Sequence, residues 1–345
     1  MMKRGSRYGV HRVLEPEGVL PQPAQRLDNS SDLYDNELLV EVSTLNVDAA
    51  SFTQIRQEVG DDQEEIARRI TSIVEERGKL QNPVTGSGGM LIGTVAEKGS
   101  SWQGIEVEVG DRIASLVSLS LTPLRLQEVE EVYLEKDQVR IRGQAVLFES
   151  SIFTRLPDDL PPVLSLAVLD VAGAPAQARR LVNKGQRVLI IGAGGKSGLL
   201  CLHEARKAVG EEGQVIGMGR SDASCRRIEE TGLADTLLQG DATRALEVYQ
   251  MVGEATDNQL VDLTINCVNI PETEMASIMS TRDQGKIYFF SMATSFTRAA
   301  LGAEGIGRDV EMIIGNGYAR GHDEIALAVL RENERIREIF ERLFT

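Results

Sequence analysis

The sequence has few cysteines and an excess of acidic over basic residues. Its three cysteines, Cys201, Cys225 and Cys267, are too few and too widely spaced for a disulfide framework, so we expect small buried apolar residues in a reducing cytoplasm. With 37 Lys and Arg against 52 Asp and Glu, the net charge is −15. Nucleic-acid backbones require clustered positive charge, so we expect no nucleic-acid partner.

Long apolar runs are also missing. Residues 1–9 are polar and no apolar stretch follows Lys3 and Arg4, which predicts that there is no signal peptide. Because no later run is long enough to span a bilayer, we expect a cytoplasmic protein without a membrane partner. The 345 residues, of which 42% are hydrophobic, are sufficient for two domains with separate cores.

The first 160 residues predict a strand-rich domain. Turn residues separate short β-branched runs at 37–43, 91–96, 112–117 and 138–142. One helix is expected to interrupt these strands at about 61–79, where Asp61 or Asp62 can cap its start and Gly78 its end. Its apolar stripe consists of Ile66, Ile70, Ile73 and Val74.

From residue 161 onward, the hydrophobic period changes to alternating strands and helices. This alternation predicts an α/β fold in which a doubly wound parallel sheet, a Rossmann domain at 161–317, follows the strand-rich domain at 1–160. Its six strands are expected at 187–191, 214–218, 236–239, 260–266, 286–290 and 311–314. Residues 318–345 predict one long amphipathic helix from His322, packed on the domains or at a dimer interface.

A glycine-rich loop joins the first of these strands to a helix. The loop reads Gly192-Ala193-Gly194-Gly195-Lys196-Ser197-Gly198. Glycine is required where the backbone turns tightly, admits a pyrophosphate and presents free helix amides to it. Ser197 replaces the usual third glycine, but the strand and helix on either side predict a nicotinamide dinucleotide site. Its expected ligands are Gly192, Gly194, Gly195, Lys196, Ser197 and Gly198. A triphosphatase loop is excluded because Ile190 stands where its first glycine is needed.

The tip of the second strand bears on the choice between NADP and NAD. It reads Gly219-Arg220-Ser221, without the carboxylate that usually accepts hydrogen bonds from the ribose of NAD. An arginine beside a hydroxyl suits a ribose phosphate, so Arg220 and Ser221 favour NADP, while Asp222 leaves NAD open. The later strands are expected to bring five further residues to the carboxyl edge of the sheet, beside the nicotinamide. These are Cys267, Val268, Asn269, Ser291 and Met292.

Several segments together resemble the medium-chain dehydrogenase/reductase superfamily. They are 82–86 with 93–95, the turn at 109–113 (VGDRI), and 182–198, which includes the glycine loop. The resemblance spans most of the chain in the expected order. It implies a GroES-like catalytic domain ahead of the nucleotide-binding domain, and a homodimer or homotetramer as is usual among these relatives.

The sequence departs from the zinc-dependent branch of this superfamily. Ser87-Gly88 stands where those enzymes have a His-Glu pair, and the four-cysteine zinc lobe is missing. The three histidines are His11, His203 and His322. Cys201 and His203 are two residues apart on a helix and therefore face different ways. We predict no metal, so that side chains and the nicotinamide must handle charge on the substrate.

Other stretches resemble the L-erythro-3,5-diaminohexanoate dehydrogenases, a family of enzymes that act in lysine fermentation. They are 8–23, 50–55 and 82–89. The resemblance implies oxidative deamination: a hydride leaves the third carbon for NAD(P), and water hydrolyses the imine to 5-amino-3-oxohexanoate and ammonia. This diamino acid needs a general base for the reacting amine, a cation for its carboxylate and an anion for its second ammonium.

The candidate residues follow from this reaction. Asp48, near the position that follows a zinc ligand in the zinc branch, could act as base or bind an ammonium, or it could anchor a turn. His11 could be the base or could be structural. Arg12 and Lys79 are candidates to bind the carboxylate, or are surface charges. Tyr8 is a further catalytic candidate. The other expected substrate-binding residues are Ser51, Gln54, Asn82 and Ser87.

Two other functions remain open from the sequence. The chain could be a different zinc-free reductase that acts on a quinone or an enone, which amine-independent reduction would reveal. It could also be a non-enzymatic protein that senses NAD(P)H, which would bind the cofactor without turnover.

Overall fold

The computed structural model describes residues 3–116, 118–315 and 317–344. The chain folds into two compact units, Met1–Pro162 and Val163–Thr345. The boundary lies two residues after the expected one at 160, and the segment 318–345 is part of the second unit. No helix in the described part of the chain is long and apolar enough to cross a membrane.

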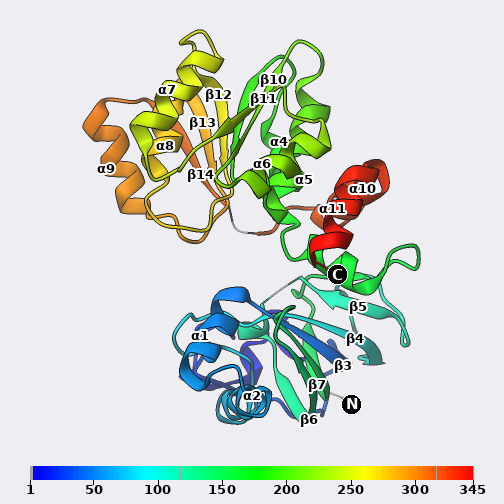
Figure 1. The fold of residues 1–345 in the computed structure, drawn as a ribbon. Coiled ribbons are helices and arrows are strands. Elements are labelled where there is room, and N and C mark those ends of the chain that lie inside the picture. Colours follow the sequence, from blue (N-terminus) through cyan, green and yellow to red (C-terminus); the bar gives the residue numbers. More distant parts are fainter. Residues whose placement is uncertain (1–2, 117, 316, 345) are drawn as a thin grey trace. The chain divides into compact units, whose positions relative to one another are not determined.

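The first unit is built around an antiparallel sheet (Figure 1). Within the described residues the order of its strands is β6-β7-β3-β4-β5-β8, and β1 and β2 form a separate pair. The elements are β1 (Val13–Glu15), β2 (Arg26–Leu27), β3 (Glu37–Val47), α1 (Ala49–Val59), α2 (Gln63–Arg77), β4 (Gly89–Lys98), β5 (Arg112–Ser115), β6 (Leu124–Tyr133), β7 (Gln138–Phe148) and β8 (Phe153–Arg155). The strands expected from the sequence are β3, β4, β5 and β7; Val117 lies outside the described residues.

Helices α1 and α2 connect strand β3 to its antiparallel neighbour β4. The expected helix is α2: Asp62 accepts hydrogen bonds from the amides of Glu64 and Glu65, and Gly78 ends the helix at φ 66°. The expectation of a single helix here is wrong, because α1 precedes it. The side chain of Asp48 caps α1, and Phe52 and Ile55 bury its apolar side in the core of the unit.

The second unit contains the parallel sheet, in the strand order β11-β10-β9-β12-β13-β14 as far as the chain is described. This order confirms the doubly wound fold. The elements are α3 (Pro162–Leu169), α4 (Gly173–Leu181), β9 (Arg187–Ile191), α5 (Lys196–Val209), β10 (Gln214–Gly219), α6 (Asp222–Thr231), β11 (Thr236–Gln239), α7 (Ala245–Ala255), β12 (Val261–Asn266), α8 (Glu274–Ser280), β13 (Thr281–Phe289), α9 (Phe296–Ile306), β14 (Val310–Ile314), α10 (His322–Glu332) and α11 (Glu334–Phe344).

Helices cover both faces of this sheet (Figure 1). On one face, side chains of α4, α5 and α6 pack against alternate residues of β9, such as Val188 and Ile190. On the other face, α7 and α8 pack against the intervening residues, Leu189 and Ile191. The central strands are therefore apolar on both sides, which explains their continuous hydrophobic runs.

The C-terminal segment is not one helix, as expected, but two. Helix α10 ends at Asn333, whose backbone is extended at φ −132° and ψ 100°. The side chain of Asn333 then accepts a hydrogen bond from the amide of Ile336 at 3.0 Å, at the start of α11. Asparagine stabilises a helix start in this way, so the chain is interrupted although the apolar period continues across the break.

Candidate active site

Asp48 lies at the junction of β3 and α1. One carboxylate oxygen, Oδ1, accepts a hydrogen bond from the amide of Ala50 at 3.2 Å and caps the helix. The other oxygen, Oδ2, accepts one from Ser51 Oγ at 3.3 Å. Because the side chain is only half-buried and a carboxylate can accept about four hydrogen bonds, it can also accept one from a further donor.

The hydroxyl of Ser51 connects Asp48 to the loop that follows α2. Ser51 Oγ lies 2.6 Å from Thr85 Oγ1, and Thr85 is exposed whereas Ser51 is buried. The three side chains form a continuous hydrogen-bonded series from the carboxylate to the surface. Such a series can carry a proton between Asp48 and solvent.

Asn82 holds this loop in place. Its Oδ1 accepts hydrogen bonds from the amides of Val84 and Thr85 at 2.8 and 3.2 Å. Its Nδ2 donates to Gln54 Oε1 at 2.6 Å and to the carbonyl of Ser51 at 3.3 Å, and its amide donates to the carbonyl of Ser87 at 2.8 Å. The structure therefore brings five expected residues together around Thr85. This Asp48 cluster consists of Asp48, Ser51, Gln54, Asn82, Thr85 and Ser87.

Arg12 and His11 are not part of the Asp48 cluster. Both contact the carboxylate of Glu37. Arg12 donates to both oxygens of Glu37, from Nε at 2.9 Å and Nη2 at 2.6 Å, and further to the carbonyls of Ser30 and Asp32. It is 0% exposed. The alternative that Arg12 is a surface charge is therefore wrong, and its burial also disfavours the expected contact with a substrate carboxylate.

Both ring nitrogens of His11 also have hydrogen-bond partners. The amide of Ser6 donates to Nδ1 at 2.9 Å, so Nε2 carries the proton and donates to Glu37 Oε1 at 2.8 Å. Burial raises the pKa of Glu37, but hydrogen bonds from His11, Arg12 and the Tyr34 amide outweigh it and lower the pKa from 4.5 to about 2. This geometry favours the structural interpretation of His11 over that of a base.

Lys79 is buried as well, with 0% exposure. Its ammonium donates to the carbonyls of Pro21 and Gln22 at 2.7 and 3.0 Å. Burial, and to a smaller extent the charge of Arg77, lower the pKa of Lys79 from 10.5 to about 8. Lys79 thus anchors the segment at 21–22 through these hydrogen bonds. The alternative that it is a surface charge is wrong. Tyr8, by contrast, is 55% exposed, and the guanidinium of Arg7 lies over its ring.

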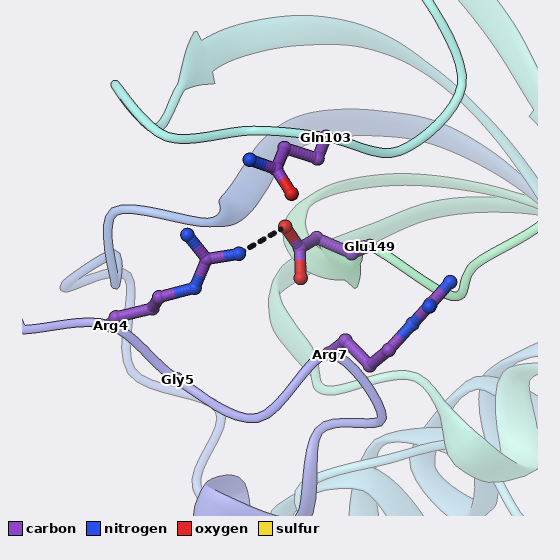
Figure 2. A pocket seen from close by; sticks show the side chains of 5 residues that line it. All are labelled: Arg4, Gly5, Arg7, Gln103 and Glu149. Atoms are coloured by element: carbon purple, nitrogen blue, oxygen red, sulfur yellow. Dashed lines mark hydrogen bonds and ion pairs between the residues drawn. The ribbon is translucent and has the colours of Figure 1, made fainter.

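A polar pocket of about 250 Å³ opens near the N-terminal segment of this unit. Figure 2 shows Arg4 extending toward Glu149, with an Nη2 to Oε1 distance of 3.1 Å, and Gln103 beside the same carboxylate. Gly5 and Arg7 complete the lining. None of the expected catalytic or substrate-binding side chains lines this pocket, so we do not assign the reaction to it.

The glycine loop of the second unit is shaped for a diphosphate. Gly192 turns the chain at φ 81°. A Cβ on Gly198 would lie 2.2 Å from the carbonyl oxygen of Gly192, so this glycine allows α5 to pack closely on the turn. Gly195 is the N-cap of α5, and within the described residues no side chain caps that helix. The first amides of α5, those of Lys196, Ser197 and Gly198, are therefore available to an anion.

The tip of β10 presents Arg220. Its side chain is 71% exposed, and its Nη2 lies 3.1 Å from Asp241 Oδ2. Ser221 Oγ accepts a hydrogen bond from the amide of Ser224 and caps α6. Asp222 accepts one from Gln239 Nε2 at 2.8 Å. Arg220, Ser221 and Asp222 thus all have local partners, and Arg220 is the exposed cation among them.

The tips of β12 and β13 meet at the carboxyl edge of the sheet. The amide of Cys267 donates to the carbonyl of Ile191 at 2.9 Å, and Val268 packs against Gly192. Ser291 Oγ donates to Asn269 Oδ1 at 3.2 Å. The structure therefore places Cys267 and Val268 next to the glycine loop, and Ser291 beside Asn269 at the same edge. Met292 is 88% exposed beside them.

Comparison with known proteins identifies the family. Residues 11–157 match the family described as the L-erythro-3,5-diaminohexanoate dehydrogenase N-terminal domain. A protein named L-erythro-3,5-diaminohexanoate dehydrogenase from Acetoanaerobium sticklandii is 53% identical over 99% of both chains. The chain belongs to the L-erythro-3,5-diaminohexanoate dehydrogenase family. A second such dehydrogenase, from Fusobacterium nucleatum, is 52% identical over 99% of this chain and 100% of its own.

Solved structures confirm the fold of this family member. The CurK enoyl reductase aligns with a TM-score of 0.55 and 15% identity, over 86% of this chain and 79% of its own. A mycobacterial protein complexed with NADPH aligns with a TM-score of 0.54 and 16% identity, over 90% of this chain and 82% of its own. The expected α/β architecture, with its strand-rich first domain, is therefore confirmed.

One group in the described part of this dehydrogenase has the composition of a metal site: His203, Glu204 and Glu332. His203 lies between the two carboxylates, with Nδ1 3.1 Å from Glu204 and Nε2 3.5 Å from Glu332. The ammonium of Lys207 lies 2.7 Å from the same oxygen of Glu332. An ammonium so close competes with a cation, and the group fits an ion-pair network that ties α10 to α5.

Sequence reasoning missed two residues of the candidate site. Thr85 lies within the segment 82–89 that carried the family resemblance, so its hydroxyl could have been chosen with Ser87. Arg227 on α6 donates from Nε to the carbonyl of Gly194 at 2.7 Å and supports the glycine loop. No local pattern indicates that contact, which depends on how α6 packs beside the loop.

Proposed function

We propose that this chain catalyses the NAD(P)-dependent oxidative deamination of L-erythro-3,5-diaminohexanoate to 5-amino-3-oxohexanoate and ammonia. The observation that carries the proposal is the identity of 53% and 52% with two dehydrogenases of that name over nearly the whole chain. The two sites support it. One unit supplies an anion-binding glycine loop, and the other a carboxylate linked through hydroxyls to solvent.

In this proposal Asp48 acts on the reacting amine. The substrate ammonium binds to the Asp48 carboxylate and transfers a proton to it, which leaves the amine lone pair free to form the imine. A bound nicotinamide would supply the acceptor for the hydride that leaves the third carbon. Ser51 and Thr85 return the proton to solvent. The regenerated carboxylate then takes a proton from the water that attacks the imine.

The residues of the second unit fit a dinucleotide. The first amides of α5, at 196–198, would hold the pyrophosphate, because they are free of side-chain partners in the described chain and carry the positive end of the helix dipole. Asn269 and Ser291, which are hydrogen-bonded to each other, would border the nicotinamide. A Cβ on Gly194 would lie 2.4 Å from the carbonyl oxygen of Ser224, so Gly194, like Gly198, allows the loop to pack closely on its neighbours and keep this shape.

The proposal is tested by following absorbance of the reduced nicotinamide with purified protein, L-erythro-3,5-diaminohexanoate and either NAD or NADP. We expect reduction only with the diamino acid, and not with lysine or simple alcohols. A chelator control belongs to the same assay, because we propose catalysis without a metal ion. An inert diamino acid would refute the proposed substrate, and reduction of an enone or a quinone by NADPH would support the alternative reductase.

We further propose that NADP is preferred over NAD. The exposed guanidinium of Arg220 follows β10, the second strand of the sheet, where dinucleotide-binding folds usually contact the ribose of the adenosine, and in this proposal it pairs with a phosphate on that ribose. Asp241 pairs with Arg220 in the structure, and removal of the arginine would release its carboxylate to accept hydrogen bonds from an unphosphorylated ribose.

Replacement of Arg220 by Gln is therefore expected to reverse the preference. The ratio of kcat/KM for NADP to that for NAD should fall by about tenfold or more, the effect of one charge-assisted hydrogen bond. The matched control is Arg226→Gln, an exposed arginine on α6, which should leave the ratio unchanged. An unchanged ratio in the Arg220 variant would contradict the role of this residue.

We also propose that the protein is a homodimer or homotetramer joined through β14. This strand forms one edge of the parallel sheet. Exposed apolar side chains surround it: Ile314 is 64% exposed, Met292 88% and Phe296 71%. An uncovered edge strand with an apolar border is a typical site of association.

Light scattering after size-exclusion chromatography tests this association. The native chain should elute as an oligomer and Ile314→Glu as a monomer, because a carboxylate would be buried in the contact. Leu246→Glu is the control, since Leu246 is 67% exposed on α7, away from the β14 edge. A monomeric native chain would refute the proposal.

The remaining features of the proposal concern the cellular setting. We propose a cytoplasmic enzyme of lysine fermentation whose partner is the small diamino acid, with neither nucleic acid nor a membrane. The net charge of −15 supports the proposal that nucleic acid is not a partner. All three cysteines are free thiols, as a reducing compartment maintains them.

A further inference from the structure

Two cysteines that are 66 positions apart in the sequence lie in contact in the second unit. The Sγ atoms of Cys201 and Cys267 are 4.0 Å apart. Cys201 lies on α5, the helix that starts at the glycine loop, and is fully buried. Cys267 is the first residue after β12 and is only half-buried. Both pack in the core cluster between α5 and the sheet.

We propose that Cys201 and Cys267 form a reversible intramolecular disulfide when a peroxide reaches the protein, and that this bond weakens dinucleotide binding. The bond requires the two sulfur atoms to approach from 4.0 Å to about 2.05 Å, a change of about 2 Å that rotation of the two side chains and a shift of α5 relative to the segment after β12 would share. The effect on binding rests on the proposed function, whereas formation of the bond does not.

Because the two cysteines differ in exposure, Cys267 is expected to react with the peroxide before Cys201 takes part. Cys267, which solvent can reach, attacks the peroxide: an S–O bond forms, the O–O bond breaks, and the departing hydroxide leaves as water with the thiol proton. The sulfur of Cys201 then attacks the sulfenic acid, so that an S–S bond forms, the S–O bond breaks, and a second water leaves with the proton of Cys201. Two thiols and one hydrogen peroxide thus give one disulfide and two waters.

Burial explains why Cys201 has this second role. It raises the pKa of the Cys201 thiol well above its usual value, and the contact with Cys267 raises it further. The thiol form reacts slowly with oxidants, so Cys201 stays reduced until a sulfenic acid forms beside it.

The disulfide would act on the cofactor through Val268. A Cβ on Gly192 would lie only 2.9 Å from Val268 Cγ2 and 3.3 Å from its amide nitrogen, so no space separates this segment from the glycine turn. A shift of Cys267 would therefore displace its neighbour Val268 relative to the turn, and a shift of α5 would displace the amides at 196–198 that we propose to bind the pyrophosphate. We expect the Kd for NADPH to rise about tenfold or more, the effect of losing one charge-assisted hydrogen bond between these amides and the pyrophosphate.

The first measurement is peptide mapping of the full-length protein under non-reducing conditions, after hydrogen peroxide treatment. We expect one linked peptide pair that contains Cys201 and Cys267, two hydrogens lighter than its parts and separated by dithiothreitol. Cys201→Ala should abolish the pair and leave Cys267 to oxidise further. Cys225→Ala is the matched control and should retain it. Oxidation of Cys267 in the native protein without the linked pair would overturn the proposal.

The second measurement is fluorescence titration of NADPH with the reduced, oxidised and re-reduced protein. In the native protein the affinity should fall on oxidation and recover with dithiothreitol. In peroxide-treated Cys201→Ala, where Cys267 oxidises beyond the sulfenic acid, dithiothreitol should not restore any affinity that is lost. If the bond forms but the affinity is unchanged, its control of binding is refuted. If the reduced protein itself does not bind NADPH, the proposed function fails while the disulfide stands.

Discussion

Asp48→Asn is expected to lower kcat for the diamino acid by about 100-fold or more, the usual contribution of a general base. Asparagine cannot accept the proton of the substrate ammonium. It caps a helix as well as aspartate does, however, so the hydrogen bond to the Ala50 amide is retained and α1 stays folded. Steady-state kinetics of the variant, with thermal unfolding as the check on folding, separate the catalytic role from the capping role.

The matched control for this variant is Asp62→Asn. Asp62 caps α2 in the same way as Asp48 caps α1, through bonds to the amides of Glu64 and Glu65. It has no part in the Asp48 cluster, so its variant should keep full activity. If Asp48→Asn retains native kcat, the base lies elsewhere and Asp48 only anchors the turn.

Glu37→Gln is expected to reduce the free energy of unfolding of the first unit by about 3 to 5 kcal/mol, the range for one partner lost from a buried ion pair. The guanidinium of Arg12 would remain fully buried, with the partly exposed carboxylate of Asp28 at 3.5 Å as its remaining ion-pair partner. Urea unfolding can be followed by the fluorescence of Trp102, because it is the single tryptophan and packs on the core of this unit.

The same pair makes unfolding dependent on pH. The pKa of Glu37 is lowered from 4.5 to about 2, so the unfolded chain binds the proton more tightly. The stability from the pair is complete above pH 4.5 and is lost as the pH falls towards 2, by roughly 3 kcal/mol in total. Glu37→Gln should lack this part of the acid dependence.

Glu128→Gln is the control for the Glu37 variant. Glu128 pairs with Arg142 at the surface, where both side chains are more than half exposed. We expect a change of less than about 1 kcal/mol, the usual value of an exposed pair. Equal effects of the two substitutions would contradict the importance given to the buried pair.

The parallel sheet could be predicted from the sequence because its signals are local. Strands buried on both faces give continuous apolar runs, and the glycine loop marks the first of them. Helix α1 was missed because only Phe52 and Ile55 bury an apolar side on it, too few to show a period. The break at Asn333 was missed because apolar residues continue at helical spacing on both sides, and only the capping bond to Ile336 reveals it.

The candidate site was predictable where residue types and a family resemblance pointed the same way. Asp48, Ser51, Gln54, Asn82 and Ser87 come together in one cluster, although their spacing alone does not show it. Charged residues were harder to interpret. The acceptors of Lys79 are carbonyls 57 and 58 positions earlier, so nothing near it in the sequence shows that it is buried. The partner of Arg12, Glu37, is likewise distant in the sequence.

The hydrogen bonds of Asn82 have a consequence for substrate affinity. Asn82 fixes the loop at 83–87 from several directions at once, through Val84, Thr85, Ser87 and Gln54. The conformational entropy of this loop is thus already lost when the unit folds. Substrate binding need not immobilise it again, which favours affinity without any added contact. Asn82 can therefore contribute to KM even if it never touches the diamino acid.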